Sequence, residues 1–253
     1  MNFEAETMKI RTAGTNPLLQ NRLSGLLKEE NVPEEILLYC GSETELEEVV
    51  SSFSGNIIFL SDARNSLDLK RLKQECYEEY ETRFRLTERQ ELPGVSGKGI
   101  DESFQPAVLP DRVILNRCAE TGGRAAEWLE GHRNGTKSLR YVSFGGSGKQ
   151  VFDLLDCRDL AALLRKQCSA FRPGLYHVSG GLPASVSLLE LTAICECATG
   201  RILKITDDES RSDVPVFLLN SGRAEQTFDW KPEYGAEEII REWNGKKGSA
   251  DHV

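Results

Sequence analysis

The sequence of 253 residues predicts an α/β protein in which a parallel sheet is followed by a smaller C-terminal α/β lobe. Short apolar runs alternate along the chain with segments whose apolar residues recur at helical spacing, which is the pattern of α/β domains. Two Ser-x-x-Glu sequences stand directly before apolar stripes, as they do at the N-termini of helices. Hydrophobic residues make up 39% of the chain, so one large domain or two small ones can form a core.

The first part of the chain predicts three strand and helix units. Apolar runs at residues 8–13, 35–40 and 56–61 predict the strands. Ser42 and Glu45 form a capping box at the start of the second helix. The apolar faces of the three helices comprise Leu19, Leu23, Leu26 and Leu27, then Leu46, Val49, Val50 and Phe53, then Leu69, Leu72 and Cys76.

Residues 81–110 have no hydrophobic period and contain several prolines and glycines, which predicts a long functional loop. The alternation resumes with predicted strands at residues 113–117, 139–144 and 174–179. A capping box of Ser187 and Glu190 opens a helix that ends at Gly200. Two further helix faces comprise Leu160, Leu163, Leu164 and Cys168, and Ile239, Ile240 and Trp243.

The net charge of the chain is −9, from 31 basic and 40 acidic residues. This excess of negative charge disfavours binding to nucleic acid or to an anionic membrane surface. No apolar run reaches the roughly 20 residues that cross a bilayer, and the start of the chain lacks the apolar segment of a secretory signal. Seven cysteines without regular spacing suit reduced thiols. We therefore expect a cytoplasmic protein.

The turn between the first strand and the first helix, residues 12–21, has the sequence TAGTNPLLQN. In dinucleotide-binding folds this turn needs three glycines, which allow a tight bend, a close approach of the pyrophosphate and close helix packing. Here only Gly14 is present, and Pro17 removes one amide donor. The second strand ends without an acidic residue that could hold a ribose hydroxyl. The sequence therefore predicts no NAD site of this kind and no bound cofactor.

Several motifs follow one another in the rest of the chain: ETRFRLTERQELPGVSGKGIDESF, VILNRC, YVSFGGSGKQVFDLLDCRDLAALLRKQ, LYHVSGG, SVSLLELTAICECATGRI, RSDVPVF and FDWKP. They resemble extended short-chain dehydrogenase/reductases of the NAD-dependent epimerase/dehydratase family, and most of all the CDP-paratose 2-epimerase branch, which acts on nucleotide sugars. The resemblance implies a truncated Rossmann-like lobe at residues 8–117 and a nucleotide-sugar-binding lobe at residues 118–253. It also implies that the chain re-enters the first lobe around residues 150–180.

The residues that catalyse the family's reaction are missing from the positions where the resemblance places them. Members of the family oxidise a sugar carbon with NAD, and a Tyr-x-x-x-Lys pair supplies the base. The helix with this pair belongs between the GIDESF and NRC motifs, where this chain has only residues 105–112, QPAVLPDR. The three fingerprint glycines are replaced by Ala13, Asn16 and Leu19. We therefore assign no catalytic residue.

The residues that the resemblance implies in substrate binding are better preserved than the catalytic ones. Two residues in each of three motifs match those of the family: Asn116, Arg117, Lys149, Gln150, Arg211 and Asp213. In the family the arginine of the last motif reaches the phosphates, for which its fork of donors is suited. Two substitutions weaken a pyrophosphate site. Phe152 replaces an arginine of the family, and Asp156 replaces a histidine.

Two other patterns invite a chemical interpretation. The GGSGK sequence lacks the residues of a phosphate-binding P-loop at Ser143 and Gln150. Cys195 and Cys197, two positions apart on a helix, face different directions, so we predict no metal site.

The sequence allows two interpretations each for His177 and Asp62. His177 is either a general base or a structural histidine of the core. Asp62 follows the strand at 56–61 in FLSDAR, and is either a new base for a non-redox reaction or the cap of the next helix.

Three functions are consistent with the sequence. The favoured one is a pseudoenzyme that binds a nucleotide sugar or a partner subunit, either a second copy or an active paralogue. The partner is suggested because the missing helix commonly forms the family's dimer, and its loss would expose an apolar sheet face. The alternatives are an enzyme that acts on a nucleotide-linked sugar through a repurposed non-redox site, and an oxidoreductase with an unorthodox cofactor site. The chain is also shorter than the extended members that it resembles.

Overall fold

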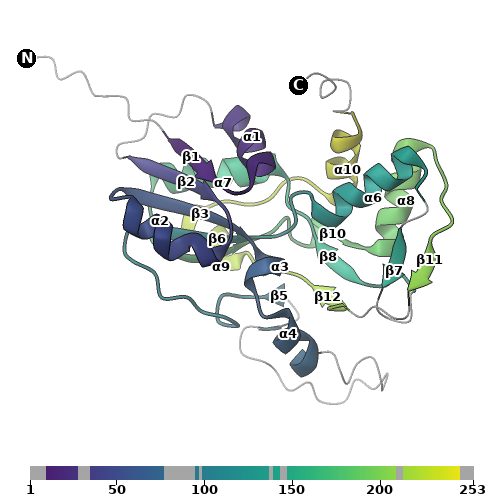
Figure 1. Cartoon of the computed structure of the whole chain (residues 1–253), viewed down its shortest axis with the longest axis horizontal. Helices are drawn as coiled ribbons and strands as arrows, with labels where there is room; N and C mark the ends of the chain where they lie inside the picture. The colour runs from purple at the N-terminus through teal and green to yellow at the C-terminus, as the bar shows by residue number, and fades with distance from the viewer. Residues whose placement is uncertain are drawn as a thin grey trace, which may run out of the picture.

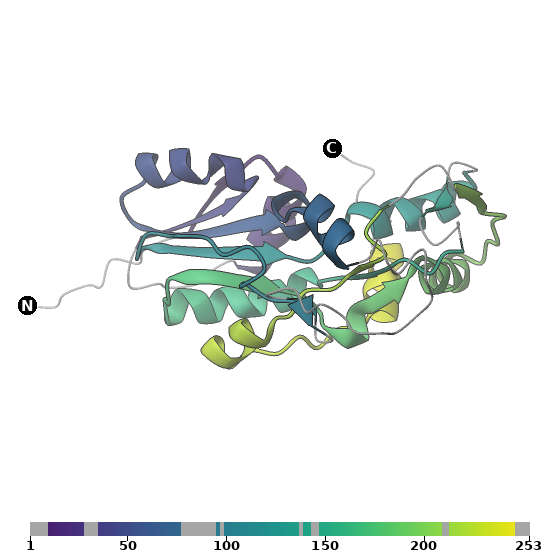
Figure 2. The same cartoon turned by 90° about the horizontal axis from the view of Figure 1, so that it is seen from below.

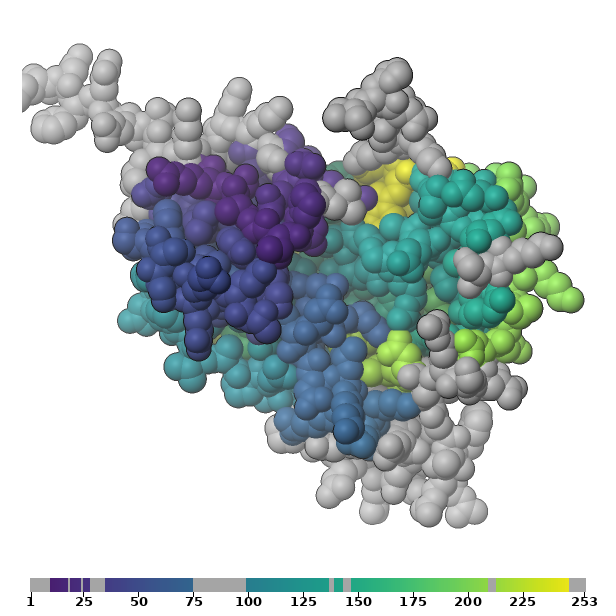
Figure 3. All heavy atoms as spheres, in the orientation of Figure 1, coloured from purple at the N-terminus to yellow at the C-terminus, as the bar shows by residue number. Residues whose placement is uncertain are grey.

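The computed structural model describes residues 10–27, 35–76, 95–96, 99–136, 139–142, 147–208 and 213–245. Two lobes lie side by side (Figure 1). One contains a parallel sheet, and the smaller one contains short strands and three helices. Figure 3 shows the segments before residue 76, in purple and blue, filling one half of this face of the molecule. The predicted α/β fold is confirmed.

The main sheet has five strands in the order β1-β2-β3-β6-β9, and every neighbouring pair is parallel. In the pairing register Leu60 of β3 lies between Cys40 of β2 and Asn116 of β6. The carboxyl ends of the strands therefore meet at one edge, where ligands of open α/β sheets bind. The strands are β1 (Arg11–Gly14), β2 (Ile36–Cys40), β3 (Asn56–Asp62), β6 (Val113–Cys118) and β9 (Gly174–Val178).

Helices cover both faces of this sheet. On one face α2 (Leu46–Ser52) packs over Ile57, Phe59 and Leu115. The other face carries α1, α7 and α9. In the edge-on view, α7 and α9 lie on the side of the sheet opposite α2 (Figure 2). The ranges of these three helices are α1 (Pro17–Leu26), α7 (Cys157–Ser169) and α9 (Gly222–Phe228). Burial on both faces explains why the central strands are continuously apolar rather than alternating.

The predicted helix ends are confirmed. Ser42 and Glu45 form the expected capping box, at a short 3₁₀ helix (Glu43–Glu45) that leads into α2. Ser187 and Glu190 form the second box at the start of α8 (Leu188–Thr199). That helix ends at Gly200, whose φ of 67° is the left-handed conformation that glycine adopts without strain.

The smaller lobe combines two short sheets with three mutually packed helices. The strand order of one sheet is β10-β8-β12, and the other pairs β11 with β7. The strands are β7 (Arg140–Val142), β8 (Val151–Asp153), β10 (Ser185–Ser187), β11 (Thr206–Asp208) and β12 (Val216–Phe217). The helices are α6 (Gly123–Asn134), α8 and α10 (Ala236–Gly245). In the ranges that the structure describes, no helix has the length and apolar character needed to cross a membrane.

Residues 99–112 lead into β6 of the main sheet. Between them and β3 lie α3 (Ala63–Ser66) and α4 (Leu69–Cys76), and β4 (Val95–Ser96) pairs with β5 (Gly99–Ile100). Ile100 exchanges backbone hydrogen bonds of 2.8 Å with Leu218 and Asn220. Residues 81–94 of the predicted loop lie outside the described ranges.

The segment 105–112, where the resemblance places the catalytic helix, is not helical. Its Ala107 and Leu109 pack on the sheet face formed by Val113, Leu115 and Leu175, which is buried. The sheet surface that the missing helix would have left bare is therefore covered by the chain itself.

Candidate functional site

Amide groups in the turn between β1 and α1 form hydrogen bonds within the protein. Gly14 has a φ of 127°, and a Cβ atom there would lie 2.1 Å from the carbonyl oxygen of Cys40. The amide of Asn16 donates to that carbonyl at 3.1 Å, and the amide of Leu19 donates to Oδ1 of Asn16 at 3.1 Å. Pro17 has no amide proton. Three of the four donors at residues 16–19 are thus absent or already occupied, so the helix start does not form the amide cradle of a pyrophosphate.

A cavity of about 350 Å³ lies beside this turn, at the carboxyl ends of β2, β3 and β6. Ten of its seventeen lining residues have polar or charged side chains, and Arg22 is its single cation among the described residues. Asp62 and Glu120 contribute carboxylates. Hydroxyl and amide groups come from Thr15, Asn16, Ser42, Ser61, Asn65, Ser66 and Thr121. This donor set suits the hydroxyl groups of a sugar or ribose better than it suits a diphosphate.

The two carboxylates of the cavity are held in different ways. Asp62 caps α3, because its Oδ1 accepts a 2.8 Å hydrogen bond from the amide of Arg64. Glu120 accepts from the amide of Ala125 in the first turn of α6. Burial raises the pKa of Glu120 to about 7, although Ala125, Arg124 and Arg64 act to lower it. Glu120 can therefore exchange a proton near neutral pH, and this cavity holds an acid–base group that the sequence did not reveal.

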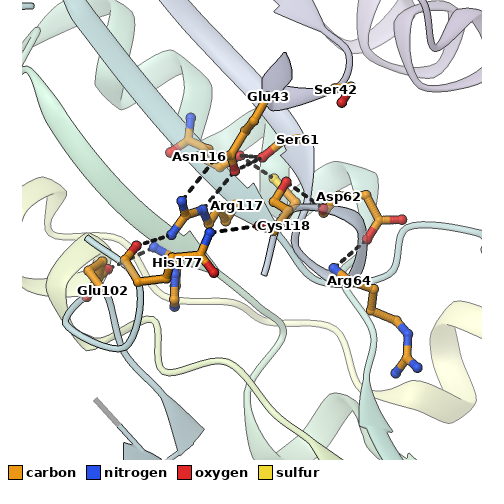
Figure 4. A network of polar contacts seen from close by, with 12 residues as sticks. Ser42, Glu43, Ser61, Asp62, Arg64, Glu102, Asn116, Arg117, Cys118 and His177 are labelled. Atoms are coloured by element: carbon orange, nitrogen blue, oxygen red, sulfur yellow. Dashed lines mark hydrogen bonds and ion pairs between the residues drawn. The ribbon is translucent and has the colours of Figure 1, made fainter. Parts of the chain in front are cut away.

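A buried ion pair lies on the opposite face of the same strand ends (Figure 4). Arg117 of β6, 2% exposed, donates to Glu43 from Nε at 2.7 Å and from Nη2 at 2.9 Å. Ser61 donates to the same carboxylate at 3.0 Å, and Nη1 of Arg117 donates to the carbonyl of Gln105. This pair lies under the non-helical segment 105–112. The predicted substrate residue Arg117 is therefore engaged by Glu43 of the same chain.

Asn116 and His177 are also engaged inside the sheet. The side-chain amides of Asn116 and Gln167 exchange two hydrogen bonds of 2.9 Å. His177 of β9 is fully buried, and its Nδ1 lies 2.8 Å from the carbonyl oxygen of Ile100. Burial lowers the pKa of His177, although Glu102 opposes this shift. The neutral, packed imidazole matches the structural interpretation of this residue more closely than a solvent-facing base.

Gln150 and Asp213 meet between the lobes. Nε2 of Gln150 donates to Oδ2 of Asp213 at 2.8 Å. Two arginines that the sequence analysis did not single out complete the cluster: Arg64 of α3 and Arg124 of α6 both form ion pairs with Asp213.

The six predicted substrate residues thus fall into separate places. Asn116 and Arg117 lie within the sheet, whereas Gln150 and Asp213 belong to the cluster between the lobes. Lys149, next to Gln150 in the sequence, is exposed, and Arg211 lies outside the described residues. Phe152, where the family has an arginine, lies under the guanidinium of Arg124, with 5.4 Å between Cζ and the ring centre.

The sequence contained one signal for the missed arginine: the loss of a cation at Phe152 in an otherwise preserved motif. Only the fold shows that Arg124, 28 positions earlier, supplies a guanidinium there. Glu43 and Glu120 had no comparable signal, because Glu43 is one of several glutamates at residues 43–48 and Glu120 is an isolated acidic residue between a strand and a helix.

No group of histidine, cysteine and carboxylate side chains within the described ranges could hold a metal ion. Cys195 is buried and Cys197 is exposed, so they point to different environments. Burial raises the pKa of Cys195 to about 12, which keeps its thiol protonated. The GGSGK motif lies partly outside the described residues.

No family model matches the sequence. Among curated proteins, the bifunctional UDP-glucose 4-epimerase and UDP-xylose 4-epimerase 1 of Pisum sativum is 26% identical over 162 residues. The match covers 62% of this chain and 41% of that protein, so the chain spans about two fifths of the length of the curated relatives it matches.

Solved structures match over nearly the whole chain. The dTDP-glucose 4,6-dehydratase of Bacillus anthracis in complex with NAD has a TM-score of 0.57 at 12% identity, covering 96% of this chain and 97% of that one. WbmG of Bordetella bronchiseptica in complex with NAD and UDP has a TM-score of 0.59 at 15% identity, covering 98% and 99%. The fold is that of the NAD-dependent epimerase/dehydratases. The resemblance to extended short-chain dehydrogenase/reductases is confirmed, while the CDP-paratose 2-epimerase branch stays a prediction.

These structures correct one expectation. We expected no cofactor, and that expectation is wrong, because proteins of this fold were solved with NAD bound. The expectation relied on a single turn, whereas the ends of β2, β3 and β6 also form the cavity at the carboxyl edge, which is present without the glycines. The side chains of this cavity fit the ribose hydroxyls of a dinucleotide. The β1–α1 turn does not fit its pyrophosphate in the family's manner.

Proposed function

We propose that this chain is a nucleotide-sugar-binding protein of the epimerase/dehydratase fold that does not perform the family's NAD-dependent redox step. The observation that supports this proposal most directly is the segment 105–112. It runs across the sheet without helical structure, and the buried pair of Arg117 and Glu43 lies beneath it. None of the six tyrosines of the sequence is followed by a lysine four positions later. The base that would take the sugar hydroxyl proton therefore has no counterpart.

The ligand class is proposed from the relatives and from the site. The matched Pisum sativum enzymes are epimerases of UDP-sugars, and the WbmG structure contains UDP. In this chain, hydroxyl and amide groups line the cavity at the carboxyl edge, and two arginines lie between the lobes. Together they would bind the sugar hydroxyls and the charged phosphates of such a ligand.

Calorimetric titration tests this proposal, with CDP-sugars, UDP-sugars and NAD as separate ligands. We expect binding of a nucleotide sugar, and we expect no NADH and no altered sugar when NAD is added. A dTDP-glucose 4,6-dehydratase with its own substrate serves as the positive control for turnover. Formation of NADH or of an epimerised sugar by this chain would contradict the proposal, and so would the failure of every nucleotide sugar to bind.

A second candidate is a non-redox enzyme that acts on a nucleotide-linked sugar. Glu120 supports it, because a buried carboxyl group with a pKa of about 7 shares the cavity with Asp62. Such pairs can donate and accept protons in one site. Chromatography of each nucleotide sugar after incubation distinguishes the candidates: a new product without NAD, lost in Glu120→Gln, would favour the enzyme.

A further inference from the structure

Two arginines from different lobes hold one carboxylate between them. Nη2 of Arg64 lies 2.9 Å and 2.8 Å from the two carboxylate oxygens of Asp213. Nη2 of Arg124 lies 2.7 Å from Oδ2 of the same residue, and Gln150 donates to that oxygen at 2.8 Å. Burial would raise the pKa of Asp213, but Arg64, Gln150 and Arg124 lower it to about 2. The carboxylate is thus ionised throughout the physiological pH range.

The cluster contains more positive than negative charge. Two guanidinium groups face a single ionised carboxylate, and Nη1 of Arg64 is buried without a hydrogen-bond partner among the described residues. The charges of both arginines act to lower the pKa of Glu120, but burial raises this pKa to about 7. Glu120 is therefore only partly ionised near neutral pH. A buried guanidinium donor without an acceptor is unfavourable, and an anion with more oxygens than a carboxylate would satisfy it.

Aromatic rings fix the two guanidinium groups. Cζ of Arg64 lies 5.0 Å from the ring centre of Phe217, and Cζ of Arg124 lies 5.4 Å from that of Phe152. Stacking of this kind holds a guanidinium plane whichever anion it faces. In Figure 4 the side chain of Arg64 extends away from the Arg117 and Glu43 pair, so the two charge networks are separate.

The cluster is accessible to a ligand. The side chains of Arg124 and Asp213 are each 24% exposed, and that of Arg64 is 17% exposed. Arg124 also lines a groove of about 1160 Å³ between α1, α6 and β7. A small anion can reach the cluster from solvent, and the groove leaves room for the organic part of a larger ligand.

We propose that Arg64 and Arg124 form a binding site for a diphosphate, and that Asp213 is an internal counter-ion which the diphosphate displaces. A carboxylate that accepts two bonds from one guanidinium presents its oxygens much as a phosphate does. Asp213 precedes β12, whereas Arg64 belongs to α3 beside the main sheet, so displacement exchanges a contact between the lobes for a contact with the ligand. This inference rests on the proposed function for the class of ligand and names the residues that bind its phosphates.

Calorimetry of the full-length protein with inorganic pyrophosphate, and then with UDP and CDP, tests the inference. We expect Arg64→Gln and Arg124→Gln each to weaken pyrophosphate binding about tenfold or more, as loss of a charged hydrogen bond does. Asp213→Asn should tighten binding by about tenfold, because it removes a competing charge at nearly constant shape. Arg241→Gln is the matched control, since Arg241 is an exposed arginine paired with Glu237.

Circular dichroism identifies variants that do not fold. If Arg124→Gln is one of them, Arg124→Lys keeps the charge, loses the fork and should bind pyrophosphate more weakly than the unmodified chain. Unchanged affinity in the folded arginine variants, or weaker affinity in Asp213→Asn, overturns the inference. An equal loss in Arg241→Gln also overturns it, because the binding would then depend on overall charge alone.

The two proposals can fail independently. Nucleotide-sugar binding that is unaffected by Arg64→Gln and Arg124→Gln contradicts the diphosphate site and leaves the proposed function intact. Pyrophosphate binding with the expected pattern of variants, but with no binding of any nucleotide sugar, supports the site and contradicts the proposed function.

Discussion

Replacing Glu43 with alanine leaves the guanidinium of Arg117 buried without its counter-ion. Arg117 is 2% exposed and loses two charged hydrogen bonds, of 2.7 Å and 2.9 Å. Within the described ranges, the carbonyl of Gln105 is then its one remaining hydrogen-bond partner. Breaking a buried pair from one side costs about 3–5 kcal/mol. Glu43 itself is 19% exposed, so water partly solvates the remaining charge and we expect the lower end, about 3 kcal/mol.

Urea denaturation followed by tryptophan fluorescence measures this change. With a slope of about 2–3 kcal/mol per molar urea, a loss of about 3 kcal/mol lowers the midpoint by about 1–1.5 M. Glu237→Ala is the control, because Glu237 forms an exposed pair with Arg241 at 2.9 Å and its loss should cost at most about 0.5 kcal/mol. Equal midpoints for Glu43→Ala and the unmodified chain would show that the segment over the sheet is not held by this pair.

The same pair predicts a dependence on pH. Burial raises the pKa of Glu43, but hydrogen bonding and the charge of Arg117, together with Ser66 and Ser61, outweigh it and lower the pKa below its usual 4.5. A carboxyl group whose pKa is lowered on folding stabilises the native state above its unfolded pKa, and this stabilisation is lost as the pH falls through the folded pKa. The difference in stability between the unmodified chain and Glu43→Ala should therefore shrink as the pH is lowered below about 4.5.

Three further changes have defined outcomes. Gly14→Ala should destabilise the protein by more than about 1 kcal/mol, because the new Cβ meets the backbone of β2 at a positive φ, whereas Gly25→Ala in open space on α1 should stabilise it by about 0.5–1 kcal/mol in the same urea titration. In Glu120→Gln, thermal melts should lose the decline in stability that the unmodified chain shows as the pH rises from about 4.5 through 7, because a carboxyl pKa raised on folding favours the native state only at low pH; parallel pH profiles would refute this. Asn116→Leu should lower stability by about 1–3 kcal/mol, because it leaves the buried amide of Gln167 unpaired, and an unchanged melting temperature would contradict that role.

Local signals predicted the elements that depend on local sequence. The runs at 35–40 and 56–61 became β2 and β3 because their apolar residues fill both faces of the sheet. The capping boxes at Ser42 and Ser187 each form within a single helical turn, so they could be predicted from the local sequence. The helix α6 was not predicted. It starts at Gly123 after Gly122 without a side-chain cap, and it contains a second glycine at Gly131.

The site was less predictable because its contacts join distant parts of the chain. Arg117 and Glu43 are 74 positions apart, and Arg64 and Asp213 are 149 apart. The family resemblance placed Gln150 and Asp213 in one functional group, and the fold brings them together. It could not show that Asn116 pairs with Gln167, because an isolated asparagine has the same sequence pattern whether it binds a ligand or another side chain.

The position of β9 beside β6 has a consequence for how the protein is made. The last strand of the main sheet, β9, ends at residue 178. The helix α9, which packs against β9, ends at residue 228. During synthesis the first 118 residues can pair four strands, but one edge and much of one face stay uncovered until most of the chain has left the ribosome. Pairing over such sequence distances slows folding, and exposed strand edges in the meantime can associate with other chains.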